Sequence, residues 1–181
     1  YDDAHYRMLH TCFLKCTSPA ELLMGFKSIG YQIGTGFMVG APFQTTEIAD
    51  DMLFLKELNP HMVGIGPFIL TTTHSFADEP AEVGIDTLSA WIDSSYAAKV
   101  LLPATTALGT ISPTGREQGI LAGANVVMPN LSPTEVRKDY LLYDNKICTG
   151  DESAQCKNCL AQRMESVGYR VVVDRGDSLN K

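Results

Sequence analysis

The sequence predicts an α/β protein built around parallel strands. Short apolar segments bounded by Gly or Pro alternate along the chain with segments of helical periodicity. The predicted strands begin roughly 25 to 40 residues apart, which leaves room for a helix between consecutive strands. The chain therefore has about four βα units, whereas a complete (β/α)8 barrel needs eight units in about 250 residues. Half a barrel and a small doubly wound sheet share this periodicity, so both architectures stay open at this point.

The four predicted strands contain no charged residue and carry Gly or Pro. Such runs are typical of strands that are buried on both faces, and Gly inside a strand indicates close approach of another backbone or a ligand. The methionines on them, Met38, Met62 and Met128, are expected to pack in the core. In chain order the strands cover residues 31–39, 62–68, 100–106 and 124–129.

Capping residues and apolar spacing predict five helices. In the first, Pro19 falls in the first turn and Gly30 follows the last turn. In the second, Thr46 is a candidate N-cap, with Glu47 and Asp50 at the positive end of the helix dipole. The third helix is predicted from a weaker periodicity of apolar residues. Ser112 begins the fourth helix and Gly123 ends it, and Ser132 caps the fifth, so that the helices cover residues 19–29, 46–58, 86–98, 113–122 and 132–143.

Composition excludes two classes of partner. The chain has 14 Lys and Arg against 21 Asp and Glu, a net charge of −7, which disfavours a nucleic-acid surface. No apolar run reaches the roughly 18 residues of a membrane helix.

No signal peptide is visible, and Tyr1 in place of Met indicates a cut edge, from processing or fragmentation. A cytoplasmic location or an anaerobic, reducing organelle is expected.

The carboxyl ends of the predicted strands, where such folds bind ligands, carry no acid or base. Hydroxyls, glycines and thioethers are found there instead, and Thr105 and Thr106 end the third strand. Paired carboxylates or a catalytic triad are therefore disfavoured. The composition suits a site in which a cofactor performs the chemistry. The uncharged stretches are 37–43, 66–73, 105–110 and 128–131.

Cysteine spacing gives the strongest local signal of chemistry. Cys148, Cys156 and Cys159 form a C-x7-C-x2-C pattern, which predicts a zinc or iron–sulfur site with one ligand unassigned. Cys12 and Cys16 have the first spacing of a C-x3-C-x2-C cluster motif. Pro19 stands at the third position, so these two are interpreted as ordinary apolar thiols.

Several stretches closely resemble HydE, the family of radical SAM maturases of [FeFe]-hydrogenase, which is related in fold to biotin synthase and PylB. They are GTGFMVGAP at 34–42, HMVGIGPFI at 61–69, the run from 101 to 151, and CKNCL at 156–160. The resemblance implies the C-terminal half of a (β/α)8 TIM-type barrel. Residues 1–143 would form this partial barrel, and residues 144–181 a cysteine-bearing C-terminal extension.

For the full-length parent, the resemblance implies an enzyme that holds S-adenosylmethionine on a [4Fe–4S] cluster and cleaves it to a 5′-deoxyadenosyl radical. The implied substrate is a small iron–carbonyl–cyanide–cysteine species delivered by HydG, and the product goes to H-cluster assembly on HydF. The missing N-terminal half of the barrel is a further implied partner. Neither a nucleic acid nor a membrane is implied.

The resemblance also assigns residues to the cavity. Met62 would line the adenine side of the S-adenosylmethionine pocket. Thr105 would lie beside the cofactor and, with Thr106, would face the substrate. Met128 would form part of the substrate-binding wall.

Two further groups are assigned outside these strands. Tyr140 and Tyr143 would close the barrel near the reacting centre as catalytic residues. Cys148, Cys156 and Cys159 would hold an auxiliary [2Fe–2S] or [4Fe–4S] cluster.

The C-x3-C-x2-C pattern is absent from these 181 residues, so the chain alone is expected to be inactive. As an isolated half-barrel it is expected to aggregate, to collapse loosely or to pair with a second copy. A metal-binding half-barrel that serves as a scaffold, and a biotin synthase-like radical SAM enzyme, remain alternatives.

Overall fold

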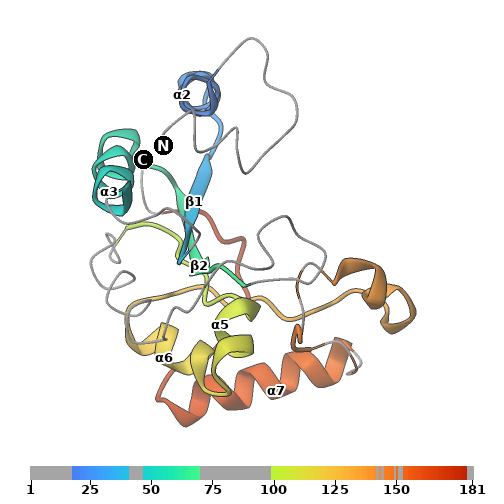
Figure 1. The fold of residues 1–181 in the computed structure, drawn as a ribbon. Helices are drawn as coiled ribbons and strands as arrows, with labels where there is room; N and C mark the ends of the chain where they lie inside the picture. Colours follow the sequence, from blue (N-terminus) through green and yellow to red (C-terminus); the bar gives the residue numbers. More distant parts are fainter. Residues whose placement is uncertain are drawn as a thin grey trace.

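The computed structural model describes residues 18–40, 47–69, 99–141, 143, 145–148, 150 and 153–178. Cys12, Cys16 and the helix predicted over 86–98 lie outside these residues. No helix in the described ranges has the length and apolarity to cross a membrane. In chain order the elements are α2 (Pro19–Ser28), β1 (Gly34–Val39), α3 (Glu47–Leu58), β2 (Met62–Pro67), α5 (Thr106–Ile111), α6 (Gly115–Leu121), the 3-10 helix η1 (Thr134–Tyr140) and α7 (Ser153–Ser166) (Figure 1).

Helix α2 begins and ends as the sequence predicts. The Ser18 hydroxyl accepts a bond from the Glu21 amide, and the Glu21 carboxylate accepts one from the Ser18 amide, which completes a capping box. Gly30 follows the helix with a φ of 91°, a conformation that glycine adopts without strain. The Lys27 ammonium donates to the carbonyls of Leu58 and Asn59 and so ties α2 to the end of α3.

The described strands are parallel and follow one another in sequence order. β1 pairs with β2 in parallel, from Gly34 opposite Met62 to Val39 opposite Pro67. Two isolated parallel bridges continue the pairing, from Met62 to Leu101 and from Pro103 to Val126. No reversal of order occurs among these described segments.

The predicted strands 100–106 and 124–129 are reduced to these bridges. Pro103 has no N–H for a ladder bond. The side chain of Asn125 also takes two ladder positions, because it accepts from the Leu102 amide and donates to the Val100 carbonyl. Thr106 does not continue the strand, because it begins α5.

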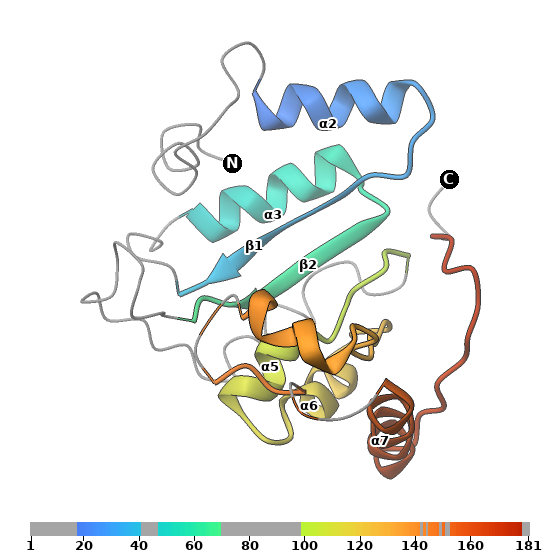
Figure 2. The same ribbon diagram turned by 90° about the vertical axis from the view of Figure 1, so that its right-hand side faces the viewer.

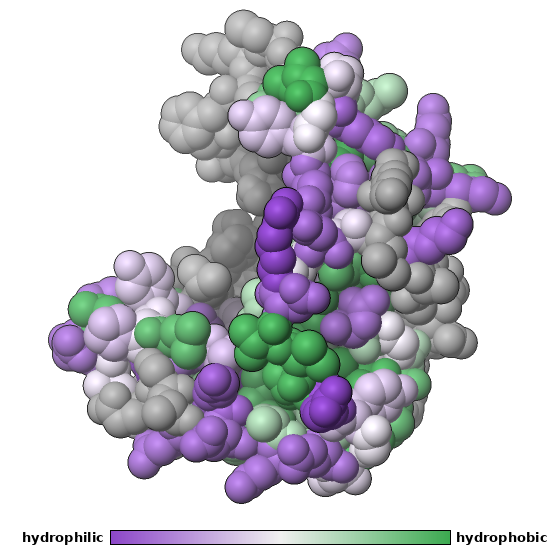
Figure 3. Space-filling view, turned by 180° about the vertical axis from the view of Figure 1, so that it is seen from behind, coloured by the Kyte–Doolittle hydropathy of each residue, from purple (hydrophilic) through white to green (hydrophobic). Residues whose placement is uncertain are grey.

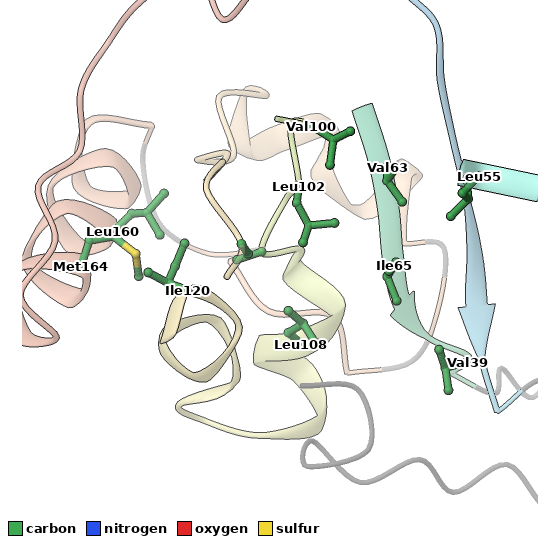
Figure 4. Packing of buried hydrophobic residues seen from close by; sticks show 12 residues of the cluster. Val39, Leu55, Val63, Ile65, Val100, Leu102, Leu108, Ile120, Leu160 and Met164 are labelled. Carbon is green, nitrogen blue, oxygen red and sulfur yellow. The ribbon is translucent and has the colours of Figure 1, made fainter. Parts of the chain in front are cut away.

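The core lies on one face of the strands, where Leu102 is 0% exposed. Burial alternates along β2, so that Val63 and Ile65 point into this core. Figure 4 shows Leu108 packed beside the strand residues and Ile120 facing Leu160 and Met164 of α7. The core placement expected for the strand methionines is wrong for two of them: Met38 is 41% and Met128 54% exposed. Met38 alternates with the buried Val39 and falls on the opposite face of β1, whereas Met128 lies beyond the isolated bridge at Val126.

Two elements at the carboxyl side differ from the prediction. The α-helix predicted over 132–143 is replaced by the 3-10 helix η1 over Thr134–Tyr140, whose N-cap is Pro133 rather than Ser132. The Arg137 guanidinium instead donates to the carbonyls of Ser132 and Asn130, which holds the chain in a tight local fold. Helix α7 was not predicted, and it carries Cys156 and Cys159.

The segment after α7 returns to the side where the strands begin (Figure 2). The amide of Ser178 donates to the Gln32 side chain, just before β1, and its hydroxyl donates to the Lys99 carbonyl, just before the third parallel segment. The Gln32 amide group donates to Asp177. This terminal strap therefore contacts the amino ends of β1 and of the third parallel segment, which lie on either side of β2.

Candidate functional site

The face of the sheet opposite the core is lined by small residues. Gly36 lies opposite Gly64, and Met38 opposite Gly66. A Cβ at Gly64 would meet no atom of the described residues within 4 Å, so these residues leave the face open there. A Cβ at Gly66 would lie 3.7 Å from the Thr105 hydroxyl, which places that hydroxyl at the carboxyl end of β2. Glycines on this face leave room for a ligand close to the backbone.

Thr105 has a buried hydroxyl with no hydrogen-bond partner in the described structure. It stands at the N-cap of α5, yet its side chain makes no capping bond. A buried polar atom without a partner is costly and marks a place where a ligand group fits. Thr105, to which the resemblance assigns a cofactor-facing and substrate-facing role, therefore has a hydroxyl with an unused hydrogen-bonding capacity among the described residues.

Thr106 and Tyr143 are brought together, as two predicted site residues should be. Their hydroxyl oxygens lie 3.0 Å apart in a hydrogen bond. The Thr106 carbonyl also accepts from the Thr110 hydroxyl within α5. Tyr143 is therefore tied to the first turn of a helix that begins at the carboxyl end of a parallel segment.

Other predicted site residues are less enclosed. Tyr140 is 60% exposed, and its carbonyl accepts from the Lys146 ammonium. Met62 is partly buried on the open face of β2, and Met128 is exposed. A space-filling view from behind shows an apolar patch in the lower half, bordered by hydrophilic residues (Figure 3). Exposed apolar surface of this kind is typical of a face that another chain or segment covers.

Two of the three predicted metal ligands face each other. Cys156 lies close enough to Cys148 to contribute to the raised pKa of the Cys148 thiol. Cys148 has a φ of 61°, and its carbonyl is held by the Asn130 side chain. The Asn130 amide donates to the Cys156 sulfur at 3.3 Å, and Arg116 donates to the Cys148 sulfur at 3.5 Å. Burial raises the pKa of the Cys148 thiol; Arg116 opposes this effect and Cys156 adds to it.

Cys159 is exposed and lies on α7 one turn beyond Cys156. No group of three or more Cys, His, Asp or Glu side chains is arranged to hold a metal ion in the described part of the chain. The donor chemistry still suits a thiophilic metal, since two sulfurs meet beside a guanidinium whose Nε is buried without a partner. Sequence reasoning missed Arg116; the only available signal was its place between Gly115 and Gly119, whose small size permits close helix packing.

The helix that carries Cys156 and Cys159 is docked by an ion pair. Arg163 of α7 donates from Nε and a terminal nitrogen to both carboxylate oxygens of Glu117, at 2.5 and 2.7 Å, and also bonds to the Pro113 carbonyl. Burial alone raises the pKa of Glu117, but the bond and charge of Arg163 outweigh it and bring that pKa below its ordinary value of 4.5. The pair joins α7 to α6.

Because the folded state lowers the pKa of Glu117, the pair contributes stability above pH 4.5 and loses it as the pH falls through the lower, folded value. We expect Glu117→Gln to cost roughly 1 to 2 kcal/mol near neutral pH and to flatten the acid dependence in that window. Urea unfolding measured from pH 3 to pH 7 checks this. Glu165→Gln, the same change at an exposed position of α7, is the control and should leave the acid dependence unchanged.

No protein-family model matches the chain. The chain is 42% identical over 160 residues to the [FeFe] hydrogenase maturase subunit HydE of Thermotoga maritima. The alignment covers 85% of this chain and 45% of that protein, so the chain spans slightly less than half the length of the relative. The resemblance to HydE that the sequence predicts is thereby confirmed over most of the chain.

Proposed function

We propose that this HydE-like chain is the C-terminal half of the barrel of a radical SAM maturase and forms the substrate-facing wall of its active site. The observation that carries the proposal is the pairing of Thr106 with Tyr143 beside the unpartnered hydroxyl of Thr105. These groups gather at the carboxyl end of parallel segments, where (β/α) barrels place their active sites.

The strand order supports a barrel rather than a doubly wound sheet. Consecutive parallel segments are neighbours from β1 through the bridges at Leu101 and Val126. A doubly wound sheet reverses its order at a switch point, whereas a barrel does not. The remaining strands would come from the part of HydE that this chain does not span, and they would cover the glycine-lined face.

The residues of this face suit S-adenosylmethionine and an organometallic substrate. When bound to its cluster, S-adenosylmethionine supplies a carbon-centred radical. The Thr105 hydroxyl would donate to a polar group of cofactor or substrate, and Met62 would pack against the adenine. Tyr143, held by Thr106, would present its hydroxyl to the substrate. The uncharged wall would exclude water and competing acid–base chemistry.

The cysteine site is proposed to hold an auxiliary iron–sulfur cluster apart from this cavity. Cys148 and Cys156 would supply two thiolates, and Cys159 would supply a third from the same helix as Cys156. HydG and HydF are proposed as the proteins that supply the substrate and receive the product. The chain alone is proposed to be inactive, because the pattern for a catalytic cluster is absent from its residues.

A hybrid protein tests the proposed function. The matched segment of the Thermotoga HydE is replaced by this chain, and the hybrid is reconstituted anaerobically with iron and sulfide. We expect reductive cleavage of S-adenosylmethionine to 5′-deoxyadenosine by the hybrid and none by this chain alone. The reaction products are measured by chromatography.

Two outcomes would contradict the proposal. A folded, cluster-loaded hybrid that cleaves no S-adenosylmethionine would favour the scaffold alternative. Cleavage that supports thiolation of a biotin precursor, but not activation of an [FeFe]-hydrogenase, would favour the biotin synthase-like alternative.

A further inference from the structure

Two arginines are buried near Cys148, and only one of them has its guanidinium fully engaged. Arg137 is 3% exposed and donates to three backbone carbonyls, those of Ser132, Asn130 and Cys148. Arg116 is 2% exposed, donates to the Cys148 sulfur at 3.5 Å, and has a buried Nε without a partner. The first arginine therefore has a structural role in the backbone, while the second points its charge at a thiol.

No carboxylate of the described residues hydrogen-bonds to Arg116, although its charge helps to lower the pKa of Glu117. Glu117 follows it directly, but both oxygens of that carboxylate bind Arg163. A buried guanidinium is stable only when an anion or a full set of acceptors accompanies it. A neutral thiol is a weak acceptor and does not meet that requirement.

The sulfurs beside Arg116 are arranged to carry negative charge. Cys148 accepts from the guanidinium, and Cys156 accepts from the Asn130 amide at 3.3 Å. Hydrogen bonds from N–H groups and a nearby cation both favour sulfur in its anionic, metal-bound form. A buried cation without a hydrogen-bonded carboxylate among the described residues thus donates to one sulfur, and a second sulfur accepts from a backbone N–H.

We propose that Arg116 is the counter-charge and positioning residue of an anionic iron–thiolate centre at Cys148 and Cys156. This inference rests on the cysteine site of the proposed function but not on its radical chemistry. Arg116 would stabilise the more negative, reduced form of the centre and so raise its reduction potential, in the way that hydrogen bonds to sulfur and net charge tune such centres.

The test uses the whole chain, reconstituted anaerobically with iron and sulfide. Iron per chain and the midpoint potential, from a titration followed by EPR, are measured for the wild type, Arg116→Met and Arg116→Lys. Arg175→Met, at a side chain that is 83% exposed, controls for loss of a positive charge. The lysine variant keeps the charge and controls for packing.

We expect Arg116→Met to shift the equilibrium toward the oxidised form at least tenfold, which is about 59 mV for one electron. The lysine variant should recover most of this shift, and Arg175→Met should match the wild type. If Arg116→Met holds no iron, the iron content of Arg116→Lys tests the role of the charge. Iron retained by Arg116→Lys supports that role, and complete loss of iron from Arg116→Lys overturns it.

The possible failures are distinguishable. A wild-type chain that takes up no iron would overturn the cysteine site itself. Iron uptake with an unchanged potential in Arg116→Met would overturn only the role of Arg116. Neither result bears on cleavage of S-adenosylmethionine by the hybrid, which tests the radical chemistry separately.

Discussion

Replacing Gly36 with alanine is expected to disrupt the pairing of β1 with β2 and to cost about 3 kcal/mol or more of unfolding free energy. A Cβ at this position would lie 2.7 Å from the carbonyl carbon of Gly64 and 2.9 Å from its Cα, with the carbonyl oxygen closer still. All three atoms belong to the backbone, so no side-chain rotation relieves the clash. The strands themselves would have to separate.

Gly64→Ala is the matched control, because it adds the same methyl group to the residue directly opposite. A Cβ at Gly64 would meet nothing within 4 Å, and the expected cost is below about 1 kcal/mol. Urea unfolding followed by far-UV circular dichroism compares the two variants. Equal unfolding midpoints for both would contradict the described approach of β1 to β2.

The second large effect is expected at Tyr143, in the hybrid with the Thermotoga HydE. Tyr143→Phe removes the hydroxyl that Thr106 holds at 3.0 Å and that we propose faces the substrate. We expect turnover of the substrate to fall about 100-fold, the lower end of what a positioned acid or base contributes. S-adenosylmethionine binding should stay near the wild-type level, since the hydroxyl is proposed to act on substrate.

Two variants of Thr106 show whether turnover depends on the position of the Tyr143 hydroxyl or only on its presence. Thr106→Ser keeps the bond to Tyr143 and should stay within tenfold of the wild type, whereas Thr106→Val should approach the loss seen in Tyr143→Phe. Tyr140→Phe is expected to cost less than Tyr143→Phe, because Tyr140 is largely exposed. Turnover and KM measured for each variant decide the matter. A larger loss at Tyr140 would reverse the assignment of the two tyrosines.

Local signals in the sequence were sufficient for the first half of the described fold. Pro19 and Gly30 indicate the ends of α2 in the sequence, and the structure adds Ser18 as the N-cap; these residues act through contacts within one turn of the helix. The apolar runs with internal glycine predict β1 and β2, because a strand buried between layers needs little beyond a short uncharged segment. The carboxyl-end position of Thr105 follows from the same reasoning.

The remaining differences between the predicted and the observed fold come from contacts between residues that are distant in sequence. Asn125 takes over ladder positions of residues 23 and 25 places away, and no spacing rule shows this. Helix α7 did leave a signal, since Cys156, Leu160 and Met164 are four apart and all buried. Cys156 and Cys159 were interpreted as metal ligands, so the spacing of Cys156 with Leu160 and Met164 was not used to predict a helix. The burial of Arg116 depends on the close packing of α5 against α6, for which Gly115 and Gly119 are the only local signal in the sequence.

The terminal strap also has a consequence for the kinetics of folding. Its bonds join Gln32 to Asp177 and Ser178 across 145 and 146 residues, and Lys99 to Ser178 across 79. Contacts of such sequence separation form after the loops between them have closed, so we expect the strap to be absent from the transition state. Removing its bonds, for instance with Gln32→Ala, should accelerate unfolding and leave the refolding rate nearly unchanged. The strap would thus determine the unfolding rate of the paired parallel segments and not the rate at which they pair during folding.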